Sequence, residues 1–228
     1  MASLPRRLLA EFLGSFAWVL VAIGAICAGQ LRAGSETEAA RLLAVAAAQA
    51  SVVAAMVALL APISGAHLNP AVTMAFWVTR RMNTPEALAY WLAQLLGGYG
   101  AAVTVKTILP DGIWRPVLLG APALAPDLLR AQGMLLEGVL TFLVVLVFVG
   151  LVIDSDSARP WRGLLTGLAV GAAVLVASPY TGGALNPARA LGPALAGGFW
   201  AAHGVFWVGP LAGGVLAGWL HDQLFARR

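Results

Sequence analysis

The tetrapeptide Leu-Asn-Pro-Ala occurs twice in this chain, at residues 68–71 and again at residues 185–188. Asparagine is a strong helix N-cap and proline suits the first position of a helix, so each copy predicts a helix start. The carbonyl oxygen of such an asparagine caps the helix, while its amide N–H groups stay free to bind the oxygen of a neutral solute. The candidate solute-contacting residues are therefore Asn69, Pro70, Ala71, Asn186, Pro187 and Ala188.

The elements that must position these residues are strongly apolar. Hydrophobic residues make up 60% of the chain and charged residues 11%, whereas a soluble domain has about 45–50% apolar and about 25% charged residues. A membrane-spanning helix needs about 20 largely apolar residues. The composition therefore predicts an all-α membrane protein with no separate soluble domain. Its six expected spans are roughly Leu8–Ala28, Leu42–Ile63, Ala87–Leu109, Leu129–Ile153, Gly163–Ser178 and Ala202–Phe225.

The two tetrapeptides belong to a longer internal repeat. Its landmarks, in chain order in each half, are Glu11 and Glu137, Pro-x-[Ser/Thr]-Gly at 62–65 and 179–182, and Gly-Gly pairs suited to close helix packing at 97–98 and 213–214. Each half contains three spans, an odd number, so the second half enters the membrane from the opposite side and the repeats are inverted. We expect one transmembrane domain over residues 1–228, with pseudo-repeats at about 5–110 and 127–226.

Each Asn-Pro-Ala is expected to start a helix that is too short to cross a membrane. The first, over residues 70–79, would be about 15 Å long, or half of a bilayer, and the second, over 188–196, is similar. Irregular backbone at membrane depth is tolerated where it is buried in protein or faces a water-filled cavity. In inverted halves the two N-termini meet near the midplane, and each contributes about half a positive charge. A passage there would repel cations, including hydronium.

Three ionisable side chains in the apolar segments or beside the motifs could contribute to function. Glu11 and Glu137 could relay protons, or could accept hydrogen bonds from the loop backbone ahead of each Asn-Pro-Ala; their symmetric placement favours the second role, loop anchoring. Arg189 follows the second motif, whereas Val72 follows the first, and a buried charge at membrane depth indicates function. No metal-ligand spacing, phosphate loop or nucleophile–base pair is visible, so we expect no enzyme, metal or cofactor.

The remaining charges predict the orientation. With an even number of spans both termini share one side, and that side holds eight basic residues against five on the other, so we expect both termini in the cytoplasm. This distribution argues against nucleic-acid binding despite the net charge of +4. The absence of an N-glycosylation acceptor fits a bacterial protein of the cell (inner) membrane. The eight are Arg6, Arg7, Arg80, Arg81, Arg159, Arg162, Arg227 and Arg228.

These features resemble the aquaporin (major intrinsic protein) family over almost the whole chain, from Glu11 to about Gly214. The double Asn-Pro-Ala motif is the most specific part of the likeness. The resemblance implies six spans plus two re-entrant half-helices, a pore in each protomer, a homotetramer, and passive conduction of water or other small neutral solutes across a lipid bilayer. It also implies that Arg189 is the arginine of the selectivity filter.

The resemblance places three further filter residues, by counting back from the motifs, at Gln49, Val174 and Gly183. Ala46 or Val45 replaces Gln49 if the register slips. Water-selective members have Phe, His and often Cys or Thr at these places, so this filter is expected to be wider. Candidate solutes besides water are urea, ammonia, hydrogen peroxide and metalloid hydroxides such as arsenite and boric acid. Valine and glycine here look more like the nodulin-type and arsenic-linked bacterial branches.

Two alternatives to a water-conducting channel follow from the same residues. Glycerol channels of the family carry Asp and a basic residue where this chain has Ala190 and Ala194, so the resemblance excludes an ordinary glycerol facilitator but leaves a channel for metalloids, urea or ammonia open. A coupled secondary transporter is the second alternative, since inverted repeats with broken helices also build those proteins. The scarcity of ionisable residues in the spans argues against it.

Overall fold

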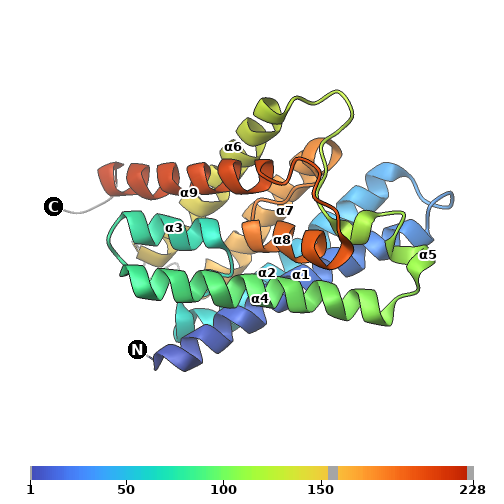
Figure 1. Ribbon diagram of the computed structural model, residues 1–228. Coiled ribbons are helices and arrows are strands. Elements are labelled where there is room, and N and C mark those ends of the chain that lie inside the picture. Colours follow the sequence, from blue (N-terminus) through green and yellow to red (C-terminus); the bar gives the residue numbers. More distant parts are fainter. Residues whose placement is uncertain (1, 154–158, 225–228) are drawn as a thin grey trace.

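The computed structural model describes residues 2–153 and 159–224, and its long elements in that part of the chain are all helices (Figure 1). They correspond to the all-α arrangement of long spans and two half-helices that the sequence predicts. In chain order the elements are α1 (Leu4–Leu31), α2 (Glu38–Ser64), α3 (Pro70–Val78), α4 (Thr84–Ile108), α5 (Asp111–Trp114), η1 (Leu118–Gly120), α6 (Arg130–Ile153), η2 (Arg159–Trp161), α7 (Arg162–Thr181), α8 (Pro187–Gly197) and α9 (Val205–Leu224).

Five of these helices, α1, α2, α4, α6 and α7, are long and apolar enough to cross a membrane by length and composition. The helix α9 is 20 residues long and takes the place of the sixth predicted span. Its composition is less apolar because His221 and Asp222 fall in its last turn. The predicted end of this span, Phe225, lies outside the described residues.

The helices α1, α2 and α4 begin three or four residues earlier than the apolar segments alone predict, whereas α9 begins three residues later than predicted. α2 begins at Glu38 rather than at Leu42, and Thr37 caps it by accepting a hydrogen bond from the backbone N–H of Ala40 at 3.2 Å. α4 begins at Thr84, three residues before the predicted start, with Asn83 as its cap. A count of apolar residues misses such polar first turns, whereas the capping residues mark the true starts.

The two half-helices interlock the halves of the chain, because α3 packs along α9 and α8 packs along α4 (Figure 1). Glycines make this approach possible. A Cβ on Gly98 of α4 would lie 2.5 Å from the carbonyl oxygen of Ala188, and one on Gly214 of α9 would lie 2.3 Å from that of Ala71. No side chain fits at such distances, so the predicted close packing at the Gly-Gly pairs is confirmed.

Small residues also join α2 to α7 in the interior. A Cβ on Gly163 would lie 2.4 Å from the carbonyl oxygen of Ala54, and one on Gly167 would lie 2.3 Å from that of Ala50. The backbones of the two helices therefore touch, as is common where helices associate in lipid. Large apolar side chains instead lie exposed on the outer faces of the helices, where lipid would surround them; examples are Leu59, Leu92 and Leu135.

The two described ends of the chain lie at the same end of the bundle (Figure 1). Arg7, near the start of α1, forms an ion pair with Glu86 in the first turn of α4. Arg81, in the turn between α3 and α4, forms an ion pair with Asp222 near the end of α9. Both ends therefore lie beside the connection from α3 to α4, as expected for an even number of spans.

Candidate functional site

The first turns of α3 and α8 begin at the two Asn-Pro-Ala motifs. Asn69 Oδ1 accepts a hydrogen bond from the backbone N–H of Ala71 at 2.8 Å, and Asn186 Oδ1 accepts one from that of Ala188 at 2.9 Å. Both asparagine side chains are buried. Each asparagine therefore caps its own half-helix, as its position before a proline predicts.

The amide nitrogens of the same asparagines link the two halves. Asn69 Nδ2 donates to the carbonyl oxygen of Leu185 at 2.9 Å, and Asn186 Nδ2 donates to that of Leu68 at 2.9 Å. Leu68 and Leu185 have φ angles of 52° and 54°, a left-handed conformation that a leucine rarely adopts. Such a residue costs about 1–3 kcal/mol and persists only when its surroundings hold it. The reciprocal hydrogen bonds from the two asparagines help to stabilise this conformation of the two leucines.

These bonds correct the prediction that all the amide N–H groups of the asparagines stay free. A primary amide has two N–H groups, and the link between the halves occupies one of them in Asn69 and in Asn186. One N–H per asparagine takes no part in this link. The partners are 116 and 118 positions apart in the chain, so the tetrapeptide alone does not reveal them.

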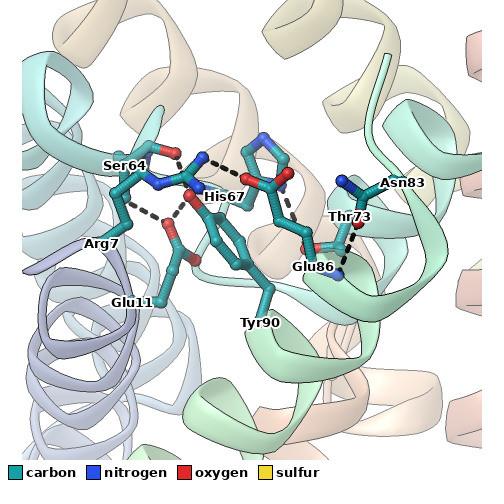
Figure 2. Close-up of polar contacts among 9 residues, drawn as sticks. Arg7, Glu11, Ser64, His67, Thr73, Asn83, Glu86 and Tyr90 are labelled. Atoms are coloured by element: carbon teal, nitrogen blue, oxygen red, sulfur yellow. Dashed lines mark hydrogen bonds and ion pairs between the residues drawn. The ribbon is translucent and has the colours of Figure 1, made fainter. Parts of the chain in front are cut away.

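Glu11, on α1, holds the loop ahead of α3 (Figure 2). Its Oε1 accepts hydrogen bonds from Ser64 Oγ at 2.6 Å and from the backbone N–H of His67 at 3.0 Å. Its Oε2 accepts from the backbone N–H of Leu68 at 2.7 Å and from Gln94 Nε2 at 2.8 Å. Four donors thus compensate a carboxylate that has no solvent exposure.

Glu137, on α6, holds the loop ahead of α8 in the matching way. Its Oε1 accepts hydrogen bonds from Thr181 Oγ1 at 2.6 Å and from the backbone N–H of Ala184 at 3.0 Å, and its Oε2 accepts from that of Leu185 at 2.6 Å. Both carboxylates are therefore engaged with the loops that carry the motifs. These contacts favour loop anchoring over a proton relay.

Two cavities lie on the two sides of the point where the half-helices meet. The larger, about 390 Å³, is open, and Arg189 lines it together with residues of α1, α2, α7 and the loop between α5 and α6. The smaller has a volume of about 10 Å³, which is room for about one water molecule. Asn69, His67, Thr166 and mostly apolar residues line it. The space enclosed by the helices is therefore much smaller beside Asn69 than beside Arg189.

Gln49 lies on α2 at the level between the cavities. Val45 lines the larger cavity and Val53 the smaller one, and Gln49 is one helical turn from each. Its side chain is 1% exposed. Val45 and Ala46 are the two alternatives to Gln49 as the filter residue of this helix. Val45 lies one helical turn closer to the larger cavity, and Ala46 is buried.

Val174 occupies the corresponding level on α7. Ser178 hydrogen-bonds the carbonyl of Val174 at 2.6 Å and lines the larger cavity, whereas Val170 lines the smaller one. A Cβ on Gly183 would lie 3.3 Å from the carbonyl oxygen of Val174. Gly183 has a φ angle of 60°, a conformation that favours glycine. Its backbone therefore lies directly beside Val174, with no side chain in between.

Arg189 lies in the first turn of α8 and is 1% exposed. Its Nη1 donates to the carbonyl oxygen of Gly120 at 2.7 Å. Gly120 belongs to the loop between α5 and α6, and Ala125 of that loop donates its backbone N–H to the carbonyl of Tyr180 at 2.8 Å, near the end of α7. Sequence reasoning missed this loop as part of the site. The proline and glycine content of this loop was the one available signal. That content indicates a loop but does not indicate that the loop contacts Arg189.

Replacing Glu137 with glutamine tests the anchoring role. A glutamine has one acceptor oxygen and an NH₂ group, so a backbone N–H of Ala184 or Leu185 would face another donor. We expect Glu137→Gln to lower the free energy of unfolding by about 1–3 kcal/mol, the cost of a buried group left unpaired, as measured by denaturant unfolding in detergent. The control Glu36→Gln removes a partly exposed carboxylate that forms a surface ion pair with Arg32, and it should change the stability little. Equal stability of the two variants would contradict anchoring.

Comparison with known proteins places this site in a family. Residues 1–221 match the major intrinsic protein family. Aquaporin TIP4-4 of Zea mays is 40% identical over 226 residues, which cover 98% of this chain and 88% of that protein. Aquaporin TIP2-1 of Arabidopsis thaliana is 36% identical, with 99% and 89% covered. The X-ray structure of the aquaglyceroporin from Plasmodium falciparum has the same fold, with a TM-score of 0.78 at 23% identity and 97% of both chains covered. The chain therefore belongs to the major intrinsic protein family, the aquaporins, which are channels and not enzymes.

Proposed function

We propose that this protein is a passive channel that carries water and other small neutral solutes across a membrane. The observation that carries the proposal is the junction of α3 and α8, which lies between two cavities and presents one amide N–H from each of Asn69 and Asn186. A solute that sheds its water needs such partners, because an unpaired polar group in an apolar path is costly. The aquaporin names of the relatives support the same function.

We also propose that the channel excludes cations, including hydronium. Each half-helix N-terminus carries about half a positive charge, and the two N-termini meet at the motifs. Arg189 adds a full positive charge beside the larger cavity, where Gly120 holds its guanidinium. A cation at this point would lose hydration and meet donors and a positive potential instead of acceptors.

The proposed selectivity filter consists of Gln49, Val174, Gly183 and Arg189. Val174 is smaller than the histidine of water-selective members and Gly183 has no side chain, so the opening is wide. The proposed solutes besides water are urea, ammonia, hydrogen peroxide and metalloid hydroxides such as arsenite and boric acid. The relatives named above are TIP aquaporins of plants; the likeness to nodulin-type and arsenic-linked branches stays a prediction about the filter residues alone.

A coupled secondary transporter would need an ionisable side chain that is free to bind the coupling ion. In the part of the chain that the structure describes, the buried carboxylates are Glu11 and Glu137, and hydrogen bonds to the loops engage both. The described part of the chain also contains no group of three or more His, Cys, Asp or Glu side chains that could hold a metal ion. Passive conduction is therefore the function that the site supports best.

The protein is a multi-pass membrane protein, and we propose a homotetramer in the cell (inner) membrane with both termini in the cytoplasm. We also propose that residues 1–228 form one domain, with pseudo-repeats at about 5–110 and 127–226. The shared side of the two described ends and the basic residues near them support this orientation. Arg227, Arg228 and the side chain of Arg159, which also entered the charge count, lie outside the described residues.

Stopped-flow light scattering on vesicles that contain the purified protein tests the proposed function. We expect water permeability well above that of empty vesicles of the same lipid, and downhill flux of small neutral solutes. Permeability no higher than that of empty vesicles, for water and for every solute, would contradict the channel. Uphill accumulation driven by a proton or sodium gradient would establish the transporter instead.

A double substitution tests the filter. Gln49→Phe with Val174→His places larger side chains at the proposed constriction, so urea permeability should fall by about tenfold, a factor typical of discrimination by pocket size, while water permeability is retained. The matched control, Val45→Phe with Ser178→His, puts the same side chains one turn away in the larger cavity and should leave urea flux close to that of the unmodified protein. Unchanged urea flux in the first variant would show that these residues do not form the constriction.

A further inference from the structure

Trp18, on α1, makes a contact with the proposed filter that the motifs do not explain. Its Nε1 donates a hydrogen bond to Gln49 Oε1 at 3.1 Å, and both side chains are buried. An indole N–H is a donor only. The oxygen end of the Gln49 carboxamide must therefore face Trp18, and the chemistry of the partner determines the orientation of the amide.

The same bond directs the nitrogen end of the carboxamide away from Trp18. Gln49 Nε2 carries two N–H groups and has no hydrogen-bond partner among the described residues, although it is buried. Buried donors in proteins nearly always have a partner, and one without a protein partner calls for water or a ligand. Since Gln49 stands between Val45 at the larger cavity and Val53 at the smaller one, such a partner would have to lie at the level between the two cavities.

A second buried donor in the same region has the same property. Arg189 Nε has no partner among the described residues, while Nη1 of the same guanidinium is held by Gly120 at 2.7 Å. Arginine cannot accept a hydrogen bond. Gln49 Nε2 on α2 and Arg189 Nε on α8 are therefore two buried donors with no partner among the described residues.

We propose that Trp18 is a positioning residue for selectivity: it holds Gln49 so that the filter presents N–H donors, and not the amide oxygen, to the passing solute. The inference rests on the proposed channel function. The solutes that such a filter favours are small neutral molecules with a strong oxygen acceptor, for example the carbonyl of urea. A cation, which needs acceptor oxygens, finds none on Gln49.

The ratio of urea permeability to water permeability tests this role, because water can replace a lost partner with a neighbouring water. Gln49→Met keeps the length of the side chain without its donors, and the ratio should fall by about two- to tenfold, the factor of one ordinary hydrogen bond. Trp18→Phe keeps an aromatic ring but frees the amide to turn, so the ratio should fall by about two- to threefold. The double variant should match Gln49→Met alone, since no amide is left to orient.

The direction of the change separates orientation from packing. Trp18 also lines the smaller cavity, so loss of ring atoms alone would widen the path and raise urea flux, whereas loss of orientation lowers the ratio. Trp77→Phe is the control, because Trp77 Nε1 donates to Thr84 Oγ1 on the exposed surface, and it should leave the ratio unchanged. Trp18→Met, which also lacks a donor, replaces Trp18→Phe if that variant does not assemble.

An unchanged or raised ratio in the Trp18 variant would overturn the inference. So would additive effects of the Trp18 and Gln49 substitutions, or an unmodified protein that conducts water but no urea. Vesicles with the unmodified protein that pass neither water nor urea would overturn the proposed function itself, so the two failures are distinguishable.

Discussion

The hydrogen bonds between each asparagine and the residue that precedes the other asparagine are the contact on which the rest of the structure depends. Asn69 reaches Leu185 and Asn186 reaches Leu68, both at 2.9 Å. One side chain therefore does two things: its oxygen starts a half-helix, and its nitrogen joins that helix to the opposite half. The leucine carbonyls that accept these bonds belong to residues in a rare backbone conformation. The hydrogen bonds between the halves therefore also help to hold this strained backbone in place.

Around this centre the two halves make nearly the same contacts, and the proposed selectivity filter depends on the positions where they differ. Ser64 and Thr181 play one role, each donating a hydroxyl at 2.6 Å to the carboxylate that anchors its loop. The halves then diverge at Arg189, whose counterpart after the first motif is Val72. The divergence places one positive charge at the larger cavity and an apolar side chain at the smaller one. In the proposed function, this difference between the halves contributes to selectivity.

Much of this fold is predictable from sequence because its signals are local. An asparagine followed by proline determines where α3 and α8 begin, and apolar segments of about 20 residues determine the spans. What sequence reasoning missed depends on residues far apart in the chain: the carbonyl of Gly120 beneath Arg189, the indole of Trp18 on Gln49, and the occupation of one asparagine N–H. These contacts arise from packing of the two halves, and neither the composition nor the period of a segment encodes them.

The free energy of unfolding of Asn69→Asp, compared with that of Asn83→Asp, tests the central link most directly. Aspartate caps a helix about as well as asparagine but has no N–H to donate, and Asn83 caps α4 through the N–H of Glu86 at 2.9 Å. The account predicts that Asn69→Asp loses about 1–3 kcal/mol, while Asn83→Asp stays within about 0.5 kcal/mol of the unmodified protein. An equal, small change in both variants would contradict it, because the link from Asn69 to Leu185 would then contribute nothing beyond the cap.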